Sequence, residues 1–245
     1  MVLSTMNDEE KAYEAFRICK WAKEIHDEYK HEIGSKFARG TRFPYFQRVV
    51  FDDDRQNKWY LTFLCKSKSD KKKGLYYCFC YTIYEIEKKK SDGTNKFDGN
   101  TGKGVLMFDP LAMSARVDGI EKRGMAVVND IVPHAFNRYT ERYLKPIGKE
   151  NIEFQRKVEN IMLRWKHFDV IGDSSSEKHK DKGFAPYDVF MSGGGILRGC
   201  FVSEGLIRFF SYVSDDMLYE DQSKWQDEME KEYQRWKRIG MYSAT

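Results

Sequence analysis

The amino-acid sequence predicts an α+β protein with mostly antiparallel sheet or sheets, an N-terminal helix, a central helix pair and a C-terminal helix. Apolar residues recur at helical spacing at both ends of the chain and in its middle. Runs rich in aromatic and β-branched residues fill the intervals, and no internal repeat occurs. The 245 residues are expected to form a single domain. A division after residue 128 would separate a helix and sheet from the helices and C-terminal sheet that follow.

The N-terminal helix is predicted over residues 8–33. Asn7 is suited to cap it, and acidic side chains fill the first turn, where the helix dipole favours anions. Gly34 is expected to end the helix. Apolar residues recur every three or four positions, at Ala12, Ala15, Phe16, Cys19, Ala22, Ile25, Tyr29 and Ile33.

Strands are predicted in the rest of the first half, because aromatic and β-branched residues dominate it. In the run 75–86 both alternating sets of residues are apolar, which is typical of a central strand packed on two faces. Residues 66–74 are expected to form a hairpin loop and residues 87–104 a long polar loop. The remaining strands are predicted at residues 45–51, 58–66, 105–108 and 125–128.

The second half begins with the central helix pair, predicted at residues 130–144 and 151–168. Residues 172–184 are polar and are expected to form a linker or loop. Gly193, Gly194 and Gly195 are interpreted as a tight strand connection, with close approach of a phosphate as the alternative. A last helix carries Trp225 and Trp236 on one side. The strands and that helix are predicted at residues 187–191, 196–202, 206–213 and 221–238.

Composition excludes several classes of protein. The chain has 42 basic and 38 acidic side chains, a net charge of +4, with no run of 18 apolar residues and no apolar or basic leader at its start. We therefore expect a cytoplasmic protein without a membrane partner. The five cysteines are irregularly spaced, which argues against a disulfide framework.

No metal or cofactor is predicted. Cys78 and Cys80 share a strand face, but no second Cys/His pair follows at zinc-site spacing, so they are interpreted as small buried hydrophobic residues. The three acids at 52–54 could bind a metal, but adjacent acids are more typical of a turn. No phosphate-binding loop, dinucleotide fingerprint, zinc-protease helix or serine nucleophile elbow is present.

The basic excess lies in the first 125 residues, mainly in lysine clusters at 66–73 and 88–90. Because the two clusters bracket an apolar strand, we expect both at one end of a hairpin. They either solubilise loop tips or form an electrostatic footprint for nucleic acid, in which Lys71, Lys72 and Lys73 would contact phosphates.

A row of basic side chains is predicted on the helix that Asp130 is expected to cap and whose first turn holds Pro133. His134, Arg138 and Arg142 recur every four positions and so lie along one side. Helix N–H groups and guanidinium groups suit a phosphate, and a first-turn histidine beside arginines favours the neutral form that a general base needs. The buried stripe of the helix is predicted at Val132, Ala135, Phe136, Tyr139 and Tyr143.

Two alternatives stay open for this row. Its arginines could pair with Glu141 or other surface acids, and its histidine could be an exposed residue of the capping turn. On the functional interpretation, Arg198 and Arg208 would join the group if the C-terminal sheet packs beside this helix.

Two motifs within residues 131–225 carry a local resemblance. The first is His-Ala-x-x-Arg-x-x-x-Arg at 134–142; the second is Ile-Arg-Phe-Phe-Ser at 207–211, before a helix that contains glutamates. Together they resemble the RelE/BrnT-type bacterial toxins, compact α+β endoribonucleases. The resemblance implies that His134, Arg138, Arg142 and Arg208 act on an RNA backbone. This chain is far longer than those toxins and has a further helix between the motifs.

The sequence thus supports two functional hypotheses. In the first, the chain binds nucleic acid, most simply RNA, and cleaves it without a metal, with His134 as base or acid and the arginines holding the phosphate. In the second, it is a non-catalytic interaction or accessory protein of phage or mobile-element origin, whose last helix contacts a protein partner.

Overall fold

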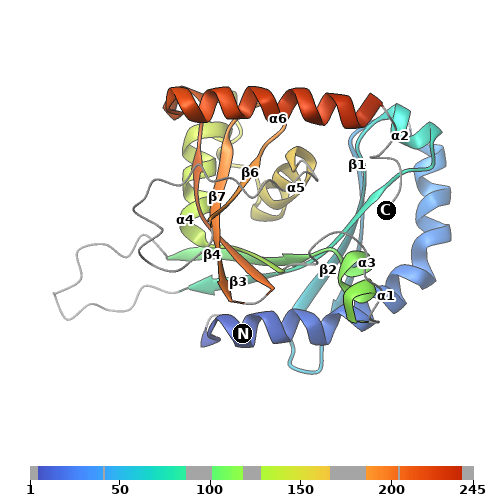
Figure 1. Ribbon diagram of the computed structural model, residues 1–245. Helices are drawn as coiled ribbons and strands as arrows, with labels where there is room; N and C mark the ends of the chain where they lie inside the picture. The colour runs from blue at the N-terminus through green and yellow to red at the C-terminus, as the bar shows by residue number, and fades with distance from the viewer. Residues whose placement is uncertain are drawn as a thin grey trace. The chain divides into compact units, whose positions relative to one another are not determined.

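The computed structural model describes residues 5–40, 42–86, 101–117, 128–165, 186–203 and 205–238 (Figure 1). It confirms the α+β class and the mostly antiparallel sheet. The strands follow one another by hydrogen bonding in the order β1-β2-β3-β4-β5-β8-β7-β6. Their bounds are β1 (Tyr45–Asp52), β2 (Lys58–Cys65), β3 (Tyr77–Ile86), β4 (Gly102–Phe108), β5 (Val128–Ile131), β6 (Pro186–Phe190), β7 (Ile196–Ser203) and β8 (Leu206–Val213).

The helices include short 3-10 and π segments. The α-helices are α1 (Asp8–Arg39), α2 (Lys68–Lys72), α3 (Pro110–Val117), α4 (Pro133–Tyr139), α5 (Phe154–Arg164) and α6 (Glu220–Arg238). The π turn η2 (Thr140–Leu144) and the 3-10 turn η3 (Lys145–Ile147) continue α4, and the 3-10 turn η5 (Asp215–Met217) precedes α6. Among the described residues, no helix is both long and apolar enough to span a membrane.

The chain divides into two compact units, which are described separately. Unit 1 comprises residues 1–84, 106–129 and 243–245, and unit 2 comprises residues 85–105 and 130–242. Strand β4 contributes residues to both.

In unit 1, α1 begins where the sequence predicts. Asn7 accepts a hydrogen bond from the Glu10 N–H, and the Glu10 carboxylate accepts one from the Asn7 N–H, so the helix has a complete capping box. The predicted end at Gly34 is wrong, because α1 continues to Arg39. Burial of Ile33 and Phe37 on either side of Gly34 outweighs the roughly 1 kcal/mol that a glycine costs inside a helix.

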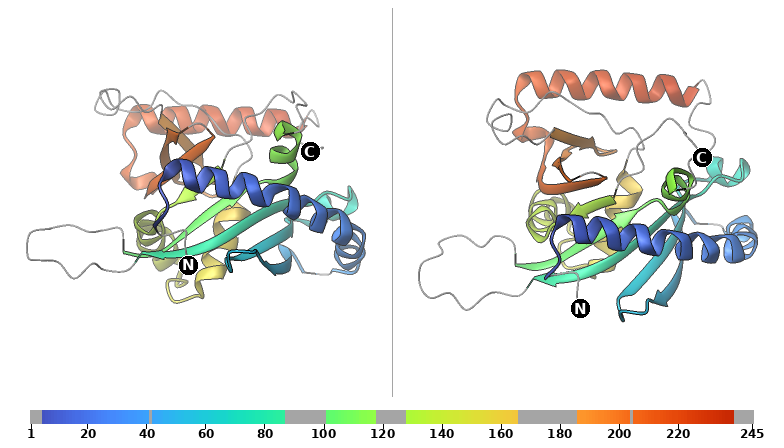
Figure 2. Two further views of the ribbon diagram at one scale, coloured as in Figure 1. Left: turned by 90° about the horizontal axis from the view of Figure 1, so that it is seen from below. Right: turned by 60° about the horizontal axis from the view of Figure 1, so that its bottom comes forward.

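The strands of unit 1 pack beneath α1, which lies across β2 and β3 (Figure 2). β1 pairs antiparallel with β2, and β2 with β3. Residues of β3 are buried on both faces, which confirms the expected central strand. Cys78 and Cys80 are buried free thiols, and burial raises the pKa of both, so they remain neutral, as small hydrophobic residues do.

Several local predictions in unit 1 need correction. The loop at 66–74 contains α2, capped by the Ser67 hydroxyl, and α3 was not predicted at all. The first lysine cluster lies on and around α2, which precedes β3; the expectation that both clusters lie at one end of a hairpin stays a prediction. Residues 88–90 themselves lie outside the described residues, as do 87–100 of the polar loop, whose last part instead begins β4 at Gly102.

In unit 2, α4 begins at Pro133, and the prediction that Asp130 caps it is wrong. Asp130 lies in β5, and the cap position is held by Val132, which has no capping side chain. The second helix of the predicted pair is α5, which ends at Arg164. The strands β6, β7 and β8 and the helix α6 agree with the predicted ranges within two residues. The polar stretch 172–184 lies outside the described residues.

Candidate nucleic-acid interface

The accessible side of α4 brings His134 and Arg138 into contact. Both side chains are half-buried, and Arg138 Nε lies 3.4 Å from His134 Nε2. A guanidinium can only donate, so His134 Nε2 is the acceptor in this contact. Arg138 Nη1 also pairs with Glu141 Oε2 at 2.9 Å. The predicted row therefore begins with a histidine that accepts from an arginine, and Glu141 balances the charge of that arginine.

Arg142 departs from the straight row. It lies in the π turn η2, and its Nη1 donates to the Tyr212 backbone carbonyl of β8 at 2.5 Å. Its partner is neutral, and among the described residues its guanidinium forms no ion pair. Arg142 thus supplies positive charge that no acid of the described chain cancels by direct contact, at the point where α4 packs against β8.

Arg208 is held in place by the strand that precedes α4. Its Nε and Nη2 both donate to Asp130 Oδ2, at 3.1 and 3.0 Å. Asp130 is fully buried and Arg208 remains partly exposed, so only the guanidinium of this pair is accessible from solvent. The C-terminal sheet does pack beside α4, as the functional hypothesis required, but Arg208 arrives there with its charge balanced.

Arg198 is placed in the same manner on β7. Its Nε lies 3.4 Å from Asp188 Oδ2, and Asp188 is buried on the neighbouring strand β6, directly opposite Arg198 in the register. An ion pair across adjacent strands stabilises the sheet locally. Nothing in the described contacts brings Arg198 to His134, so its assignment to nucleic acid rests on the sequence alone.

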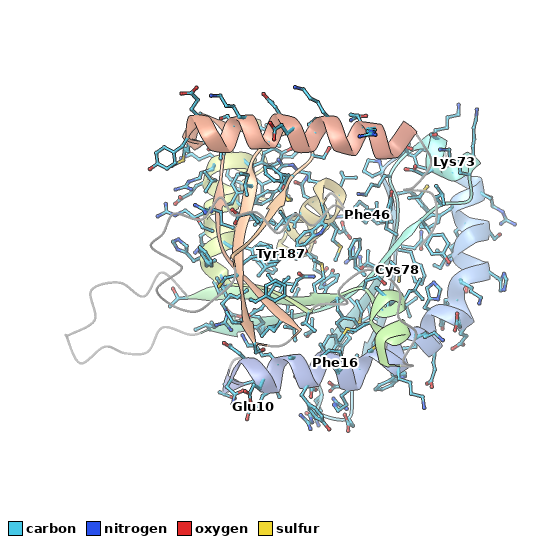
Figure 3. The ribbon with its side chains drawn as sticks, viewed as in Figure 1. Glu10, Phe16, Phe46, Lys73, Cys78 and Tyr187 are labelled. Carbon is cyan, nitrogen blue, oxygen red and sulfur yellow. The ribbon has the colours of Figure 1, made fainter. Side chains whose placement is uncertain are left out.

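The predicted lysines lie on unit 1. Lys71 Nζ donates to the Gly40 carbonyl at 2.8 Å and so ties α2 to the end of α1. Lys72 and Lys73 are exposed, and Lys73 extends from the end of α2 in Figure 3. These two side chains fit the solubilising interpretation and the electrostatic one equally well.

Arg164 is a central residue of unit 2 that the sequence did not single out. Its guanidinium lies 3.4 Å from the ring centre of Tyr143 and donates to the hydroxyls of Tyr139 and Tyr212, at 3.1 and 3.5 Å. Burial raises the pKa of Tyr139 and of Tyr212, so both phenols stay neutral. Four-residue spacing of Tyr139 and Tyr143 was visible in the sequence, but nothing marked Arg164 as their partner.

The same guanidinium also fixes the turn between β6 and β7. Arg164 Nε donates to the Ser192 carbonyl at 2.8 Å, and Nη2 donates to the Gly194 carbonyl. At Gly195, with φ of +83°, a Cβ atom would lie 2.0 Å from the Tyr212 hydroxyl. The glycines therefore make the tight strand connection that was expected, and the Gly194 and Gly195 backbone is engaged by the chain itself.

The acids at 52–54 span the end of β1 and the turn that follows it. Asp53 is buried and accepts from the backbone N–H of Arg55 and Asn57 and from the Trp59 indole. These donors outweigh the cost of burial, so the pKa of Asp53 is lowered. Among the described residues, no three His, Cys, Asp or Glu side chains are grouped as metal ligands.

Comparison of the chain with protein-family models, with curated proteins and with solved structures finds no match. The site is therefore interpreted from its own geometry.

Proposed function

We propose that this chain binds RNA through a surface of unit 2 formed by His134, Arg138 and Arg142. The observation that carries the proposal is the contact of His134 with Arg138 on the accessible side of α4, four residues before Arg142, which forms no ion pair with a described residue. Such a group combines a proton acceptor with guanidinium donors that suit phosphate oxygens.

The proposed chemistry is metal-independent cleavage of the phosphodiester bond. An arriving phosphate draws Arg138 away from His134, which frees the Nε2 lone pair. His134 then takes the proton of the ribose 2′-hydroxyl, the 2′-oxygen attacks phosphorus, and the 5′-oxygen leaves with a proton from water. The products are a 2′,3′-cyclic phosphate and a 5′-hydroxyl, and Arg142 balances the charge that develops on phosphorus oxygens.

In this proposal Arg208 and Arg198 have a structural role and do not hold the phosphate. Because each is paired with a buried aspartate, they position the strands beside α4 and add little net attraction for a phosphate. The local resemblance to RelE/BrnT-type toxins supports a ribonuclease activity through the helix motif more than through the strand motif.

The test is incubation of the full chain with total RNA in EDTA, beside His134→Ala and a matched His31→Ala control. His31 is an exposed histidine on α1 of unit 1. We expect cleavage by the unmodified chain and by the control, and none by His134→Ala. Intact RNA with the unmodified chain would remove the ribonuclease proposal.

RNA binding is tested separately by the salt dependence of affinity. We expect the dissociation constant for RNA to rise with salt concentration. RNA binding should persist in His134→Ala, and the affinity should fall in Arg142→Gln. Affinity that does not change with salt or with Arg142 would remove the RNA proposal altogether.

One observation favours a non-catalytic protein-binding role as the second candidate. Met217 and Tyr219 are large apolar residues exposed beside the start of α6, with 48% and 75% of their surface accessible. The two side chains lie two positions apart, and such a pair offers apolar surface that a protein partner could cover. The side chains of Trp225 and Trp236, on which the partner prediction rested, lie outside the described residues.

A further inference from the structure

Strand β1 ends the described strand order, and a defined set of its backbone groups points away from β2. No described strand pairs with its outer side. The turn after β1 shows which residues face β2: the Asp53 N–H donates to the Asn57 carbonyl, and the Asp53 carbonyl accepts from Gln56. In an antiparallel ladder these roles alternate. The N–H and C=O groups of Phe46, Arg48, Val50 and Asp52 therefore point outward.

An antiparallel copy of β1 can pair with this edge only if outward-pointing residues lie opposite one another. Two-fold registers with their axes at positions 48, 49 and 50 satisfy that condition around the outward residues Arg48 and Val50. The first sets Arg48 against its own copy, which places like charges together. The second sets Arg48 against Val50. The third sets Val50 against its own copy, with Arg48 opposite Asp52 on both sides of the axis.

The third register is favoured by charge and by burial together. It forms two cross-strand Arg48–Asp52 pairs, and opposite charges directly across an antiparallel pair are stabilising. It also covers Val50, a β-branched residue in mid-strand with 51% of its surface exposed. The side chains of Arg48, Val50 and Asp52 lie on the same strand face, so the contact is continuous.

We propose that a second copy of this chain docks on the outer edge of β1, antiparallel and centred on Val50, and joins the two sheets edge to edge. In this dimer Val50 exchanges two N–H···O=C bonds with its own copy. Each Arg48–Asp52 pair exchanges two more. The inference is independent of the RNA proposal, because β1 belongs to unit 1 and the candidate RNA surface to unit 2.

The experiment is sedimentation of the full chain over a dilution series, with charge-reversed variants. The unmodified chain is expected at twice its mass of 29.0 kDa. Arg48→Asp and Asp52→Arg each replace two attractive pairs by two repulsive ones, and each is expected to weaken dimerisation by roughly tenfold or more. The double variant Arg48→Asp/Asp52→Arg restores opposite charges and is expected to regain the dimer. That rescue separates the interface from a folding defect in a single variant.

A cysteine cross-link tests the centre of the register. Directly opposed residues of a hydrogen-bonded pair have Cα atoms about 5.5 Å apart, within reach of a disulfide. Val50→Cys is expected to give a covalent dimer on mild oxidation, whereas Lys20→Cys, on an exposed position of α1, is not. A monomer at every concentration would overturn the proposal, because the charge on Arg48 would then protect the edge from pairing. A dimer that neither the reversals nor the cross-link affects would overturn it too.

Discussion

Two nitrogens of Arg208 donate to one carboxylate oxygen of Asp130: Nε and Nη2 lie 3.1 and 3.0 Å from Asp130 Oδ2. The aspartate is fully buried in β5, the strand that directly precedes α4 in the chain. This pair explains why the expected helix cap is a strand residue. A buried carboxylate needs a partner of opposite charge, and β8 supplies one.

The first prediction concerns that pair. Arg208→Gln leaves the Asp130 carboxylate buried without its cation, and we expect the free energy of unfolding to fall by about 2 kcal/mol. Asp130→Asn/Arg208→Gln removes both charges and should cost less than the sum of the two single changes. Denaturant titration of the four proteins in a double-mutant cycle measures the coupling. Strict additivity would contradict the assigned pair.

Arg164 is expected to be the most sensitive arginine of unit 2. A lysine at this position keeps the charge but cannot reach two backbone carbonyls and two tyrosine hydroxyls with one planar group. Arg164→Lys should therefore lower the free energy of unfolding by about 3 kcal/mol, since buried donors and acceptors lose their partners. Arg156→Lys, on an exposed arginine of the same helix, is the matched control and should change it by less than about 0.5 kcal/mol.

Glu141 is expected to restrain RNA binding. Its carboxylate pairs with Arg138 Nη1, so Glu141→Gln releases a guanidinium beside His134. We expect RNA affinity to increase by about threefold, the size of effect that one exposed ion pair supports. Glu32→Gln removes the same charge from α1, where Glu32 pairs with Lys36, and should leave affinity unchanged. Equal gains in the two variants would show that only net charge matters.

Asp109 predicts a pH dependence of stability with a defined sign. Burial raises the pKa of Asp109 above its ordinary value of 3.8, although its carboxylate accepts from the N–H groups of Leu111 and Ala112. The folded chain therefore favours the protonated form of Asp109. The contribution of Asp109 to the free energy of unfolding is fully present below pH 3.8 and is lost as the pH rises through the raised pKa.

Asp109→Asn keeps an oxygen for the same two N–H groups but does not ionise. The difference in unfolding free energy between variant and unmodified chain should therefore shift in favour of the variant as the pH is raised from below 3.8 to neutrality. Denaturant titrations across that range measure it. A shift in favour of the unmodified chain would contradict the assigned cause.

Much of the fold was predictable because its signals are local. Asn7 and Glu10 form a capping box within four residues, and the double-sided apolar run of β3 identifies a central strand without reference to any partner. The end of α1 was not predictable from Gly34, because burial of Ile33 and Phe37 by the rest of unit 1 overrides the local preference.

The candidate site was predictable only in part. The four-residue spacing of His134 and Arg138 does bring the two side chains together, since both lie on one helix. The π turn at Thr140–Leu144 then turns Arg142 toward the Tyr212 carbonyl. Aspartates on β5 and β6 balance Arg208 and Arg198, and no spacing along the chain reveals which carboxylates lie opposite them.

Local sequence was sufficient to determine most of the strands, the longer helices and the shared helix face of His134 and Arg138, because caps, periodicity and helical spacing act within a few residues. Only the folded chain decided which arginines are paired with an acid among the described residues, and which strand ends the described sheet. Both depend on residues far apart in sequence: Asp130 meets Arg208 across 78 positions, and β1 is an edge because no described strand lies beyond it.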